Sequence, residues 1–176
     1  YIISVLSCVK YHNIINLLKG FKQFKKETNS NIKFVLVMQI LDKDYYKEII
    51  NYINDNFTKG KIIIFSNLDN SYLINLYKYA KFYIFSSYCE VFGLTSLEAM
   101  SQNCPVVLSN RSALPEINSD AAYYFDPDNE IQIKESINKI LNDDFYRNSL
   151  INRGEKHYKN FSWEKTVFET SKILRI

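Results

Sequence analysis

Residues 82–100 read FYIFSSYCEVFGLTSLEAM, and this stretch decides the expected fold. Residues 82–85 form a short aromatic and β-branched run, which is typical of a buried strand. Leu94, Leu97 and Met100 recur at helical spacing, and Thr95 stands three residues before Glu98, as in a capping box. The stretch therefore predicts a strand, a tight turn and the start of a helix.

This strand, turn and helix have the arrangement of a ligand site. In an open α/β sheet, ligands bind beyond the carboxyl ends of the strands, and the unpaired N–H groups at a helix start suit a phosphate. Gly93 fits the turn, because a residue without a Cβ lets the backbone approach a ligand closely. We therefore expect a binding site around residues 86–98.

On both sides of this stretch, strands alternate with helices. We expect strands at 2–6, 32–37, 61–65, 82–85, 106–109 and 123–125, and helices around 14–24, 46–53, 73–80, 94–100, 131–141, 143–158 and 163–174. Asp42 or Asp44 can cap the second helix. Such alternation predicts parallel strands joined by right-handed crossovers. The expected fold class is α/β, a Rossmann-like, doubly wound, mainly parallel sheet of about six strands with helices on both faces.

Composition and charge narrow the class of protein. A chain of 176 residues with 47% hydrophobic residues can bury the core of one domain, so residues 1–176 are expected to form a single domain. A net charge of +3 permits a small anionic ligand, but no base-reading motif accompanies it, so nucleic acid is the least favoured partner. The chain begins inside a strand, which indicates a piece of a longer protein.

The cysteines and the apolar runs of the sequence indicate the cellular compartment and the kind of membrane contact to expect. Cys8, Cys89 and Cys104 lie far apart without CxxC spacing, which argues against zinc or a disulfide framework and favours a reducing cytoplasm. No run approaches the ~20 apolar residues that cross a bilayer, so any membrane contact would be peripheral or would involve another part of the protein.

A family resemblance rests on an ordered set of motifs. Glu90 and Glu98 are separated by seven residues around Phe92-Gly93-Leu94, which resembles the E-x7-E signature of the retaining glycosyltransferases of family 4. The likeness continues through residues 97–100, 104–107, 114–116, 121–122 and 161–164. It implies the C-terminal, donor-binding half of a two-domain GT-B enzyme, with the N-terminal acceptor domain absent from this sequence. Trp163 is expected either to pack on that partner domain or to anchor the core.

The resemblance also implies an activity. The expected enzyme is a metal-independent hexosyltransferase of polysaccharide biosynthesis, which moves a hexose from a UDP- or GDP-linked sugar to a glycan or lipid-linked acceptor. The nucleotide sugar is its substrate, and no cofactor is expected. The protein is expected in the cytoplasm, with at most peripheral contact at the inner face of the membrane. The carboxylate pairs Asp42/Asp44 and Asp126/Asp128 are interpreted as helix caps and turns rather than as metal ligands.

Residue roles follow from the same resemblance. Glu90 is the expected catalytic residue beside the transferred sugar, and Glu98 is expected to accept hydrogen bonds from the ribose. Glu98 as a capping-box carboxylate alone is the alternative. We expect both glutamates and the bend between them to share one pocket. By the same resemblance, the backbone amides of Phe92, Gly93, Leu94 and Thr95 contact the sugar and phosphates. The backbone of Ser66, Asn67 and Leu68 is expected to line the base, with a plain surface turn as the alternative.

The sequence departs from the family in the first strand-to-helix loop. Ser7 and His12 stand where the family usually carries an arginine and, five residues later, a lysine that clasp the diphosphate. Neither supplies a fixed positive charge at neutral pH, so Lys10 and a protonated His12 are the candidate substitutes, with a solvated loop lysine as the alternative for Lys10. Losing one such donor costs ~3 kcal/mol of transition-state stabilisation. The alternative function is therefore a catalytically impaired nucleotide-sugar-binding module with a regulatory or assembly role.

Overall fold

The chain folds around one parallel β-sheet. The computed structural model describes residues 1–66 and 68–174. Six strands pair in parallel in the order β3-β2-β1-β4-β5-β6. They are β1 (Ile2–Cys8), β2 (Phe34–Ile40), β3 (Ile62–Ser66), β4 (Tyr83–Phe85), β5 (Val106–Ser109) and β6 (Ala122–Phe125). The expected doubly wound α/β fold is confirmed.

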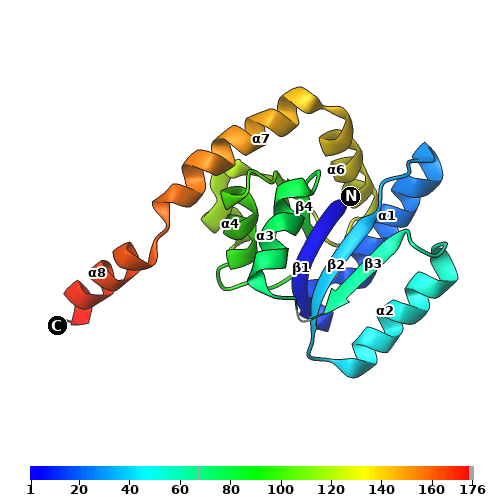
Figure 1. Ribbon diagram of the computed structural model, residues 1–176, viewed down its shortest axis with the longest axis horizontal. Helices are drawn as coiled ribbons and strands as arrows, with labels where there is room; N and C mark the ends of the chain where they lie inside the picture. Colours follow the sequence, from blue (N-terminus) through cyan, green and yellow to red (C-terminus); the bar gives the residue numbers. More distant parts are fainter. Residues whose placement is uncertain (67, 175–176) are drawn as a thin grey trace.

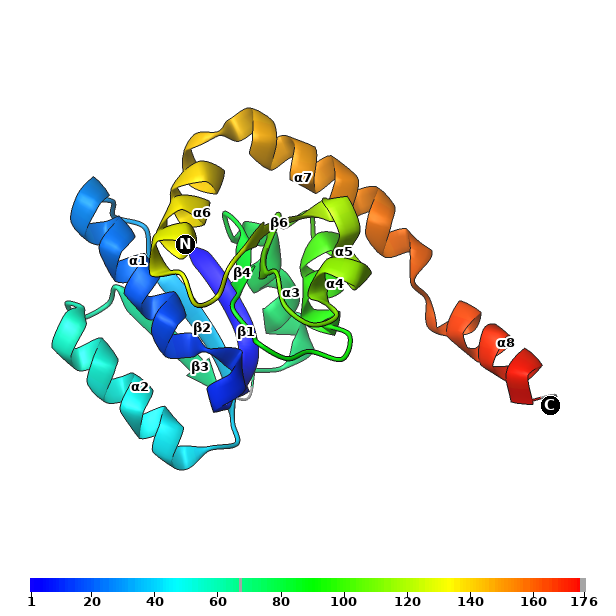
Figure 2. The ribbon, with the colours of Figure 1, turned by 180° about the vertical axis from the view of Figure 1, so that it is seen from behind.

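Helices cover both faces of the sheet (Figures 1 and 2). On one face, α1 packs against α2 and α6, and on the other, α3 packs against α4. Right-handed crossovers explain this, since the chain passes from β3 to β4 across β1 and thereby changes face. The helices are α1 (Ile14–Thr28), α2 (Lys43–Asn56), α3 (Asn70–Tyr79), α4 (Leu94–Ser101), α5 (Leu114–Asn118), α6 (Glu130–Asn142), α7 (Asp144–His157) and α8 (Trp163–Leu174). Three short 3-10 turns join them: η1 (Lys10–His12), η2 (Ser119–Ala121) and η3 (Tyr158–Asn160).

The strands at the centre of the sheet supply most of the core. All three residues of β4 are buried, as the aromatic and β-branched run predicted. The second strand begins at Phe34 rather than at Ile32, because Ile32 donates its N–H to Ser30 Oγ and its carbonyl accepts from Lys25 Nζ. Asp42 caps α2 by accepting from the N–H groups of Asp44 and Tyr45.

The start of α4 differs from the predicted capping box. The N-cap is Gly93, in the left-handed conformation with φ of +79°, and it has no side chain to cap with. Thr95 and Glu98 therefore lie inside the helix, and the Thr95 hydroxyl is hydrogen-bonded to the Tyr83 hydroxyl instead. The capping box is wrong, so a capping role no longer accounts for Glu98.

The C-terminal helix α8 projects away from the body (Figures 1 and 2). None of its described residues is buried, and Trp163 is 74% exposed. The interpretation of Trp163 as a core anchor is wrong. Its neighbours on the helix, Val167 and Phe168, are exposed as well, so α8 presents apolar side chains that this domain does not cover.

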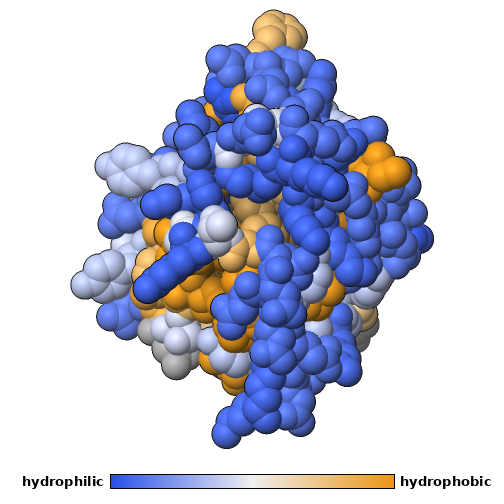
Figure 3. Space-filling model, turned by 90° about the vertical axis from the view of Figure 1, so that its right-hand side faces the viewer, coloured by the Kyte–Doolittle hydropathy of each residue, from blue (hydrophilic) through white to orange (hydrophobic). Residues whose placement is uncertain are grey.

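A second apolar surface lies at the edge of the sheet. Figure 3 looks at the side of the molecule that carries α2 and β3, and hydrophobic surface gathers in the middle of this face. The exposed apolar side chains at this edge include Ile40, Leu41 and Phe65. In the described residues, no helix is both long enough and apolar enough to cross a membrane.

Candidate functional site

Two loops meet where the strand order reverses. β1 has β2 on one side and β4 on the other, so the loops that follow β1 and β4 leave the sheet side by side. Hydrogen bonds join them: Tyr88 N–H donates to the Tyr11 carbonyl at 2.8 Å, and the Ser86 hydroxyl lies within hydrogen-bond distance of the His12 and Asn13 carbonyls. This is the position at which open α/β sheets bind ligands.

A cleft of about 730 Å³ opens at this position. Eight of the predicted site residues line it: Ser7, His12, Leu68, Glu90, Phe92, Gly93, Leu94 and Thr95. The rest of the described lining is Val5, Leu6, Tyr11, Val37, Met38, Gln39, Leu73, Phe85, Cys89 and Val91. The predicted bend is therefore open to solvent rather than filled by packed side chains.

His12 and Glu90 form the polar contact at the centre of the cleft. His12 Nε2 lies 3.1 Å from Glu90 Oε1, and the side chains are only 8% and 20% exposed. The other ring nitrogen, Nδ1, lies 2.6 Å from the Ser7 carbonyl, which can only accept, so Nδ1 carries a proton. A second proton must then lie between Nε2 and the carboxylate for that contact to be a hydrogen bond. The geometry is therefore that of a carboxylate held in contact with an imidazole ring.

Neighbouring groups hold this pair in place. The His12 ring packs edge-on against Tyr11 and Phe85, with ring centroids 4.7 and 5.1 Å away. The Glu90 backbone is fixed from the loop after β5, since its N–H donates to Ser112 Oγ and its carbonyl accepts from the same hydroxyl. The carboxylate thus has a defined position without any ligand.

The start of α4 supplies backbone donors to the same cleft. Leu94 and Thr95 lie in the first turn, where N–H groups have no acceptor within the helix. A Cβ on Gly93 would lie 2.8 Å from Leu114 Cδ2, so both the left-handed φ and the close packing favour glycine here. Among the lining residues that the structure describes, there is no lysine or arginine, so these N–H groups and His12 are the donors best placed for an anion.

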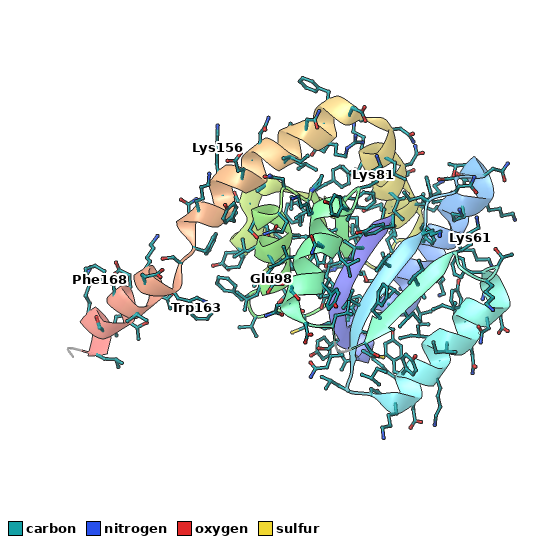
Figure 4. The ribbon with its side chains drawn as sticks, viewed as in Figure 1. Lys61, Lys81, Glu98, Lys156, Trp163 and Phe168 are labelled. Carbon is teal, nitrogen blue, oxygen red and sulfur yellow. The ribbon has the colours of Figure 1, made fainter. Side chains whose placement is uncertain are left out.

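Glu98 lies one helical turn further along α4 and faces a different hollow. This hollow, of about 270 Å³, lies between α3 and α4 and shares Leu73 with the main cleft. The expectation that both glutamates share one pocket is therefore wrong; they line adjoining ones. Thr95 and Glu98 lie on the same side of α4 but one turn apart, so Thr95 borders the cleft at the start of the helix, whereas Glu98 reaches the hollow beside α3 (Figure 4).

Two further predicted residues, Lys10 and Ser66, lie outside the cleft lining, and a third is not among the described residues. Lys10 is 70% exposed and pairs with Glu48 at 3.6 Å, outside the cleft lining. Ser66 ends β3 and is not among the lining residues, and Asn67 lies outside the described residues. Sequence reasoning missed the contributions of β2, Val37 to Gln39, although a strand that neighbours β1 must end at the same edge.

Comparison with known proteins relates this chain to a family. The family described as "Glycosyl transferases group 1" matches residues 1–157. O-antigen chain mannosyltransferase B of Escherichia coli is 31% identical over 165 residues, covering 93% of this chain and 42% of that protein. O-antigen chain mannosyltransferase RfbU of Salmonella typhimurium is 26% identical, covering 80% of this chain and 38% of that protein.

Solved structures share the fold. The C-terminal domain of a group 1 family glycosyl transferase, LpcC, from Francisella tularensis superposes with a TM-score of 0.79 at 22% identity, covering 91% of this chain and 85% of that domain. The chain spans less than half the length of the two curated mannosyltransferases named above.

Proposed function

Because this chain belongs to the family of group 1 glycosyl transferases, we propose that it is the donor-binding, C-terminal domain of a retaining hexosyltransferase. The observation that carries the proposal is the cleft at the strand-order reversal, in which a positioned carboxylate, Glu90, faces the open start of α4. Sugar transfer from a nucleoside diphosphate places negative charge on the leaving group, and donors aimed at that charge stabilise the transition state.

In this proposal the donor lies across both hollows. Its diphosphate faces the N–H groups of Leu94 and Thr95, and its sugar lies beside Glu90 in the main cleft. The ribose lies toward Glu98 in the adjoining hollow, and the base lies along the segment of Leu68. Leu73, which lines both hollows, marks the point at which the nucleotide passes between them.

In this proposal His12 replaces the lysine with which the family usually contacts the diphosphate, but it acts differently. Both ring nitrogens already have partners, so His12 first positions Glu90 and reaches a phosphate only by turning away from it. The described lining offers a single carboxylate, Glu90, and a histidine engages it. The proposal therefore assigns charge neutralisation to backbone donors and His12, without a metal ion.

The donor sugar and the acceptor follow from the relatives. The two curated relatives named above are mannosyltransferases of O-antigen chains, so we propose mannosyl transfer to a glycan or lipid-linked acceptor in polysaccharide biosynthesis. The three cysteines are free, which supports a reducing cytoplasm. We propose at most peripheral contact with the inner membrane face.

Acceptor binding is assigned to a second domain. The exposed apolar side chains of α8, including Trp163 and Phe168 (Figure 4), support a neighbouring domain that covers them. The chain also spans only 42% of its mannosyltransferase relative from Escherichia coli, which leaves room for such a domain.

A thermal-shift panel tests the proposal. The chain is heated with GDP- and UDP-linked mannose and glucose, and a ligand at 100 times its Kd should stabilise the native state by ~2.7 kcal/mol. A rise in Tm with one of these donors, and transfer of its sugar by the natural protein that contains the chain, support the proposal. Binding without transfer or donor hydrolysis would favour the impaired module, and no shift with any donor would contradict both.

A further inference from the structure

The hollow between α3 and α4 has a built polar floor. Asn70, Leu73, Ile74 and Tyr77 line it from α3, and Glu98, Ser101 and Gln102 line it from the other side. Tyr77 is 1% exposed, and its hydroxyl lies 3.3 Å from Glu98 Oε2. An exposed carboxylate thus contacts a buried phenol from the neighbouring helix.

The direction of this hydrogen bond is fixed. Burial raises the pKa of the Tyr77 phenol, and the nearby hydroxyl of Tyr83 and the Glu98 carboxylate raise it further, so the phenol keeps its proton. The hydroxyl therefore donates and Glu98 Oε2 accepts. The contact occupies one carboxylate oxygen and leaves the other, Oε1, to accept from a ligand.

The phenol itself is held rigidly. Its ring packs edge-on against the ring of Tyr83, with centroids 5.9 Å apart, and Tyr83 is fully buried. The Tyr83 hydroxyl is bonded to Thr95 Oγ1 at 2.8 Å, three residues before Glu98 on α4. The two tyrosines therefore contact two successive turns of α4, one beside the main cleft and one in the smaller hollow.

We propose that Tyr77 is a positioning residue that holds the Glu98 carboxylate so that its free oxygen accepts hydrogen bonds from the ribose hydroxyls of the donor. This inference rests on the proposed function, which places the ribose beside Glu98. Tyr77 touches no reacting atom; it acts through Glu98. A rigid carboxylate loses little rotamer freedom when the ribose binds, and that preorganisation is the source of the gain in affinity.

If the hydrogen bond between Tyr77 and Glu98 only stabilised the fold, the loss of the Tyr77 hydroxyl would have a different effect. A buried hydroxyl needs an acceptor, and Glu98 could serve only to satisfy Tyr77. Removing the hydroxyl would then change the stability of the domain, and any change in affinity would be the same for nucleotides with and without ribose hydroxyls. A comparison of ligands with and without ribose hydroxyls therefore distinguishes the two roles.

The experiment compares Tyr77→Phe with the unaltered chain in binding two ligands. These are the nucleoside diphosphate of the preferred donor and its 2′,3′-dideoxy form, measured by calorimetry. We expect Tyr77→Phe to weaken binding of the ribose form about fivefold to tenfold, which corresponds to ~1 to 1.4 kcal/mol. We expect no change in the affinity of the dideoxy form, because it lacks the hydroxyls that Glu98 would bind.

A matched control variant and a test in a chain that lacks the Glu98 carboxylate show whether the effect depends on the contact between Tyr77 and Glu98. Tyr1→Phe removes another hydroxyl that bonds to α3, at the Leu76 carbonyl, and should leave both affinities unchanged. In a Glu98→Ala background, the effect of Tyr77→Phe on the ribose form should disappear. Tm and circular dichroism confirm that each variant is folded.

The outcomes separate this inference from the function on which it rests. Equal loss for both nucleotides, or no loss for either, would overturn the role of Tyr77 and leave the proposed function in place. Failure of the unaltered chain to bind any nucleoside diphosphate would overturn the proposed function and this inference together.

Discussion

The two glutamates of the site occupy different surroundings on one short segment of chain. Glu90 precedes α4, is only 20% exposed and contacts an imidazole at 3.1 Å. Glu98 lies within α4, is exposed and accepts from a buried phenol. Histidine can carry a positive charge near neutral pH, whereas a buried tyrosine stays a neutral donor.

The difference indicates a division of work. A carboxylate in contact with an imidazole, a common proton donor and acceptor in catalysis, is suited to a site where charge changes during a reaction. A carboxylate held by a neutral donor is suited to recognising hydroxyl groups that do not react. We therefore expect changes at Glu90 to affect the rate of transfer and changes at Glu98 to affect donor affinity.

Replacing each carboxylate with an amide is the most direct test of the proposed difference between Glu90 and Glu98. Glu90→Gln should lower kcat about 10²- to 10³-fold, the loss typical of one group that stabilises a transition state. Glu98→Gln should leave kcat nearly unchanged and raise the donor KM about tenfold, as for one lost charge-assisted hydrogen bond. Steady-state kinetics of the transferase measure both, and equal effects on kcat would show that the two glutamates do not differ in role.

Gly93 connects the two environments, and changing it tests the shape of the bend. Gly93→Ala should lower the free energy of unfolding by ~2 kcal/mol, because alanine is strained at φ of +79° and its Cβ would lie 2.8 Å from Leu114 Cδ2. Gly60→Ala is the matched control, since Gly60 has φ of +82° but a Cβ added there would meet no atom within 4 Å. Urea unfolding compares them, and equal losses would mean that the contact with Leu114 carries no cost.

Replacing His12 sharpens the assignment of its role. His12→Ala leaves the Glu90 carboxylate without its donor and should lower kcat about tenfold, less than the loss at Glu90 itself. His12→Lys places a fixed positive charge at this position and should recover part of the rate. The same variants should leave the affinity for a nucleoside alone unchanged, because the hollow of Glu98 does not include His12. A loss of nucleoside affinity in His12→Ala would contradict the division between the two hollows.

Thiol labelling gives the smallest perturbation and reports on occupancy of the main cleft. Cys89 is exposed and lines the cleft, whereas Cys8 and Cys104 are buried. Burial and the nearby Asp42 carboxylate raise the pKa of Cys8 to about 11. Because the thiolate is the reactive form, Cys8 should stay unlabelled at pH 8 and label faster only as the pH rises toward 11.

We expect Cys89 to react first at pH 8 and to be protected by the donor nucleotide sugar. Mass spectrometry of alkylated peptides identifies the labelled site. Labelling of Cys89 at the same rate with saturating donor would show that the donor does not enter the main cleft.

Local pattern was sufficient for most of the fold. Runs such as residues 82–85 and 106–109 predicted buried strands, and both lie at the centre or inner part of the sheet. Boundaries were less predictable where side chains compete for backbone groups, as Ser30 and Lys25 do at Ile32. The predicted capping box failed because the spacing of Thr95 and Glu98 does not reveal that Gly93 begins the helix.

Contacts between distant segments could not be predicted in the same way. The distance between His12 and Glu90 depends on two loops that are separated by α1, β2, α2, β3, α3 and β4. The pairing of Lys10 with Glu48 depends on the position of α2. Local propensity carries no information on either distance.

The sequence by itself determined the alternation of strands and helices, because periodicity and turn chemistry act over a few neighbouring residues. Its resemblance to a known family also implied eight of the residues that line the cleft. Tertiary structure alone decided which groups meet. It placed His12 on Glu90, separated Glu98 into its own hollow above Tyr77, and left α8 uncovered. The reason is physical, since hydrogen bonds act over about 3 Å and only the packed sheet brings such distant residues within that range.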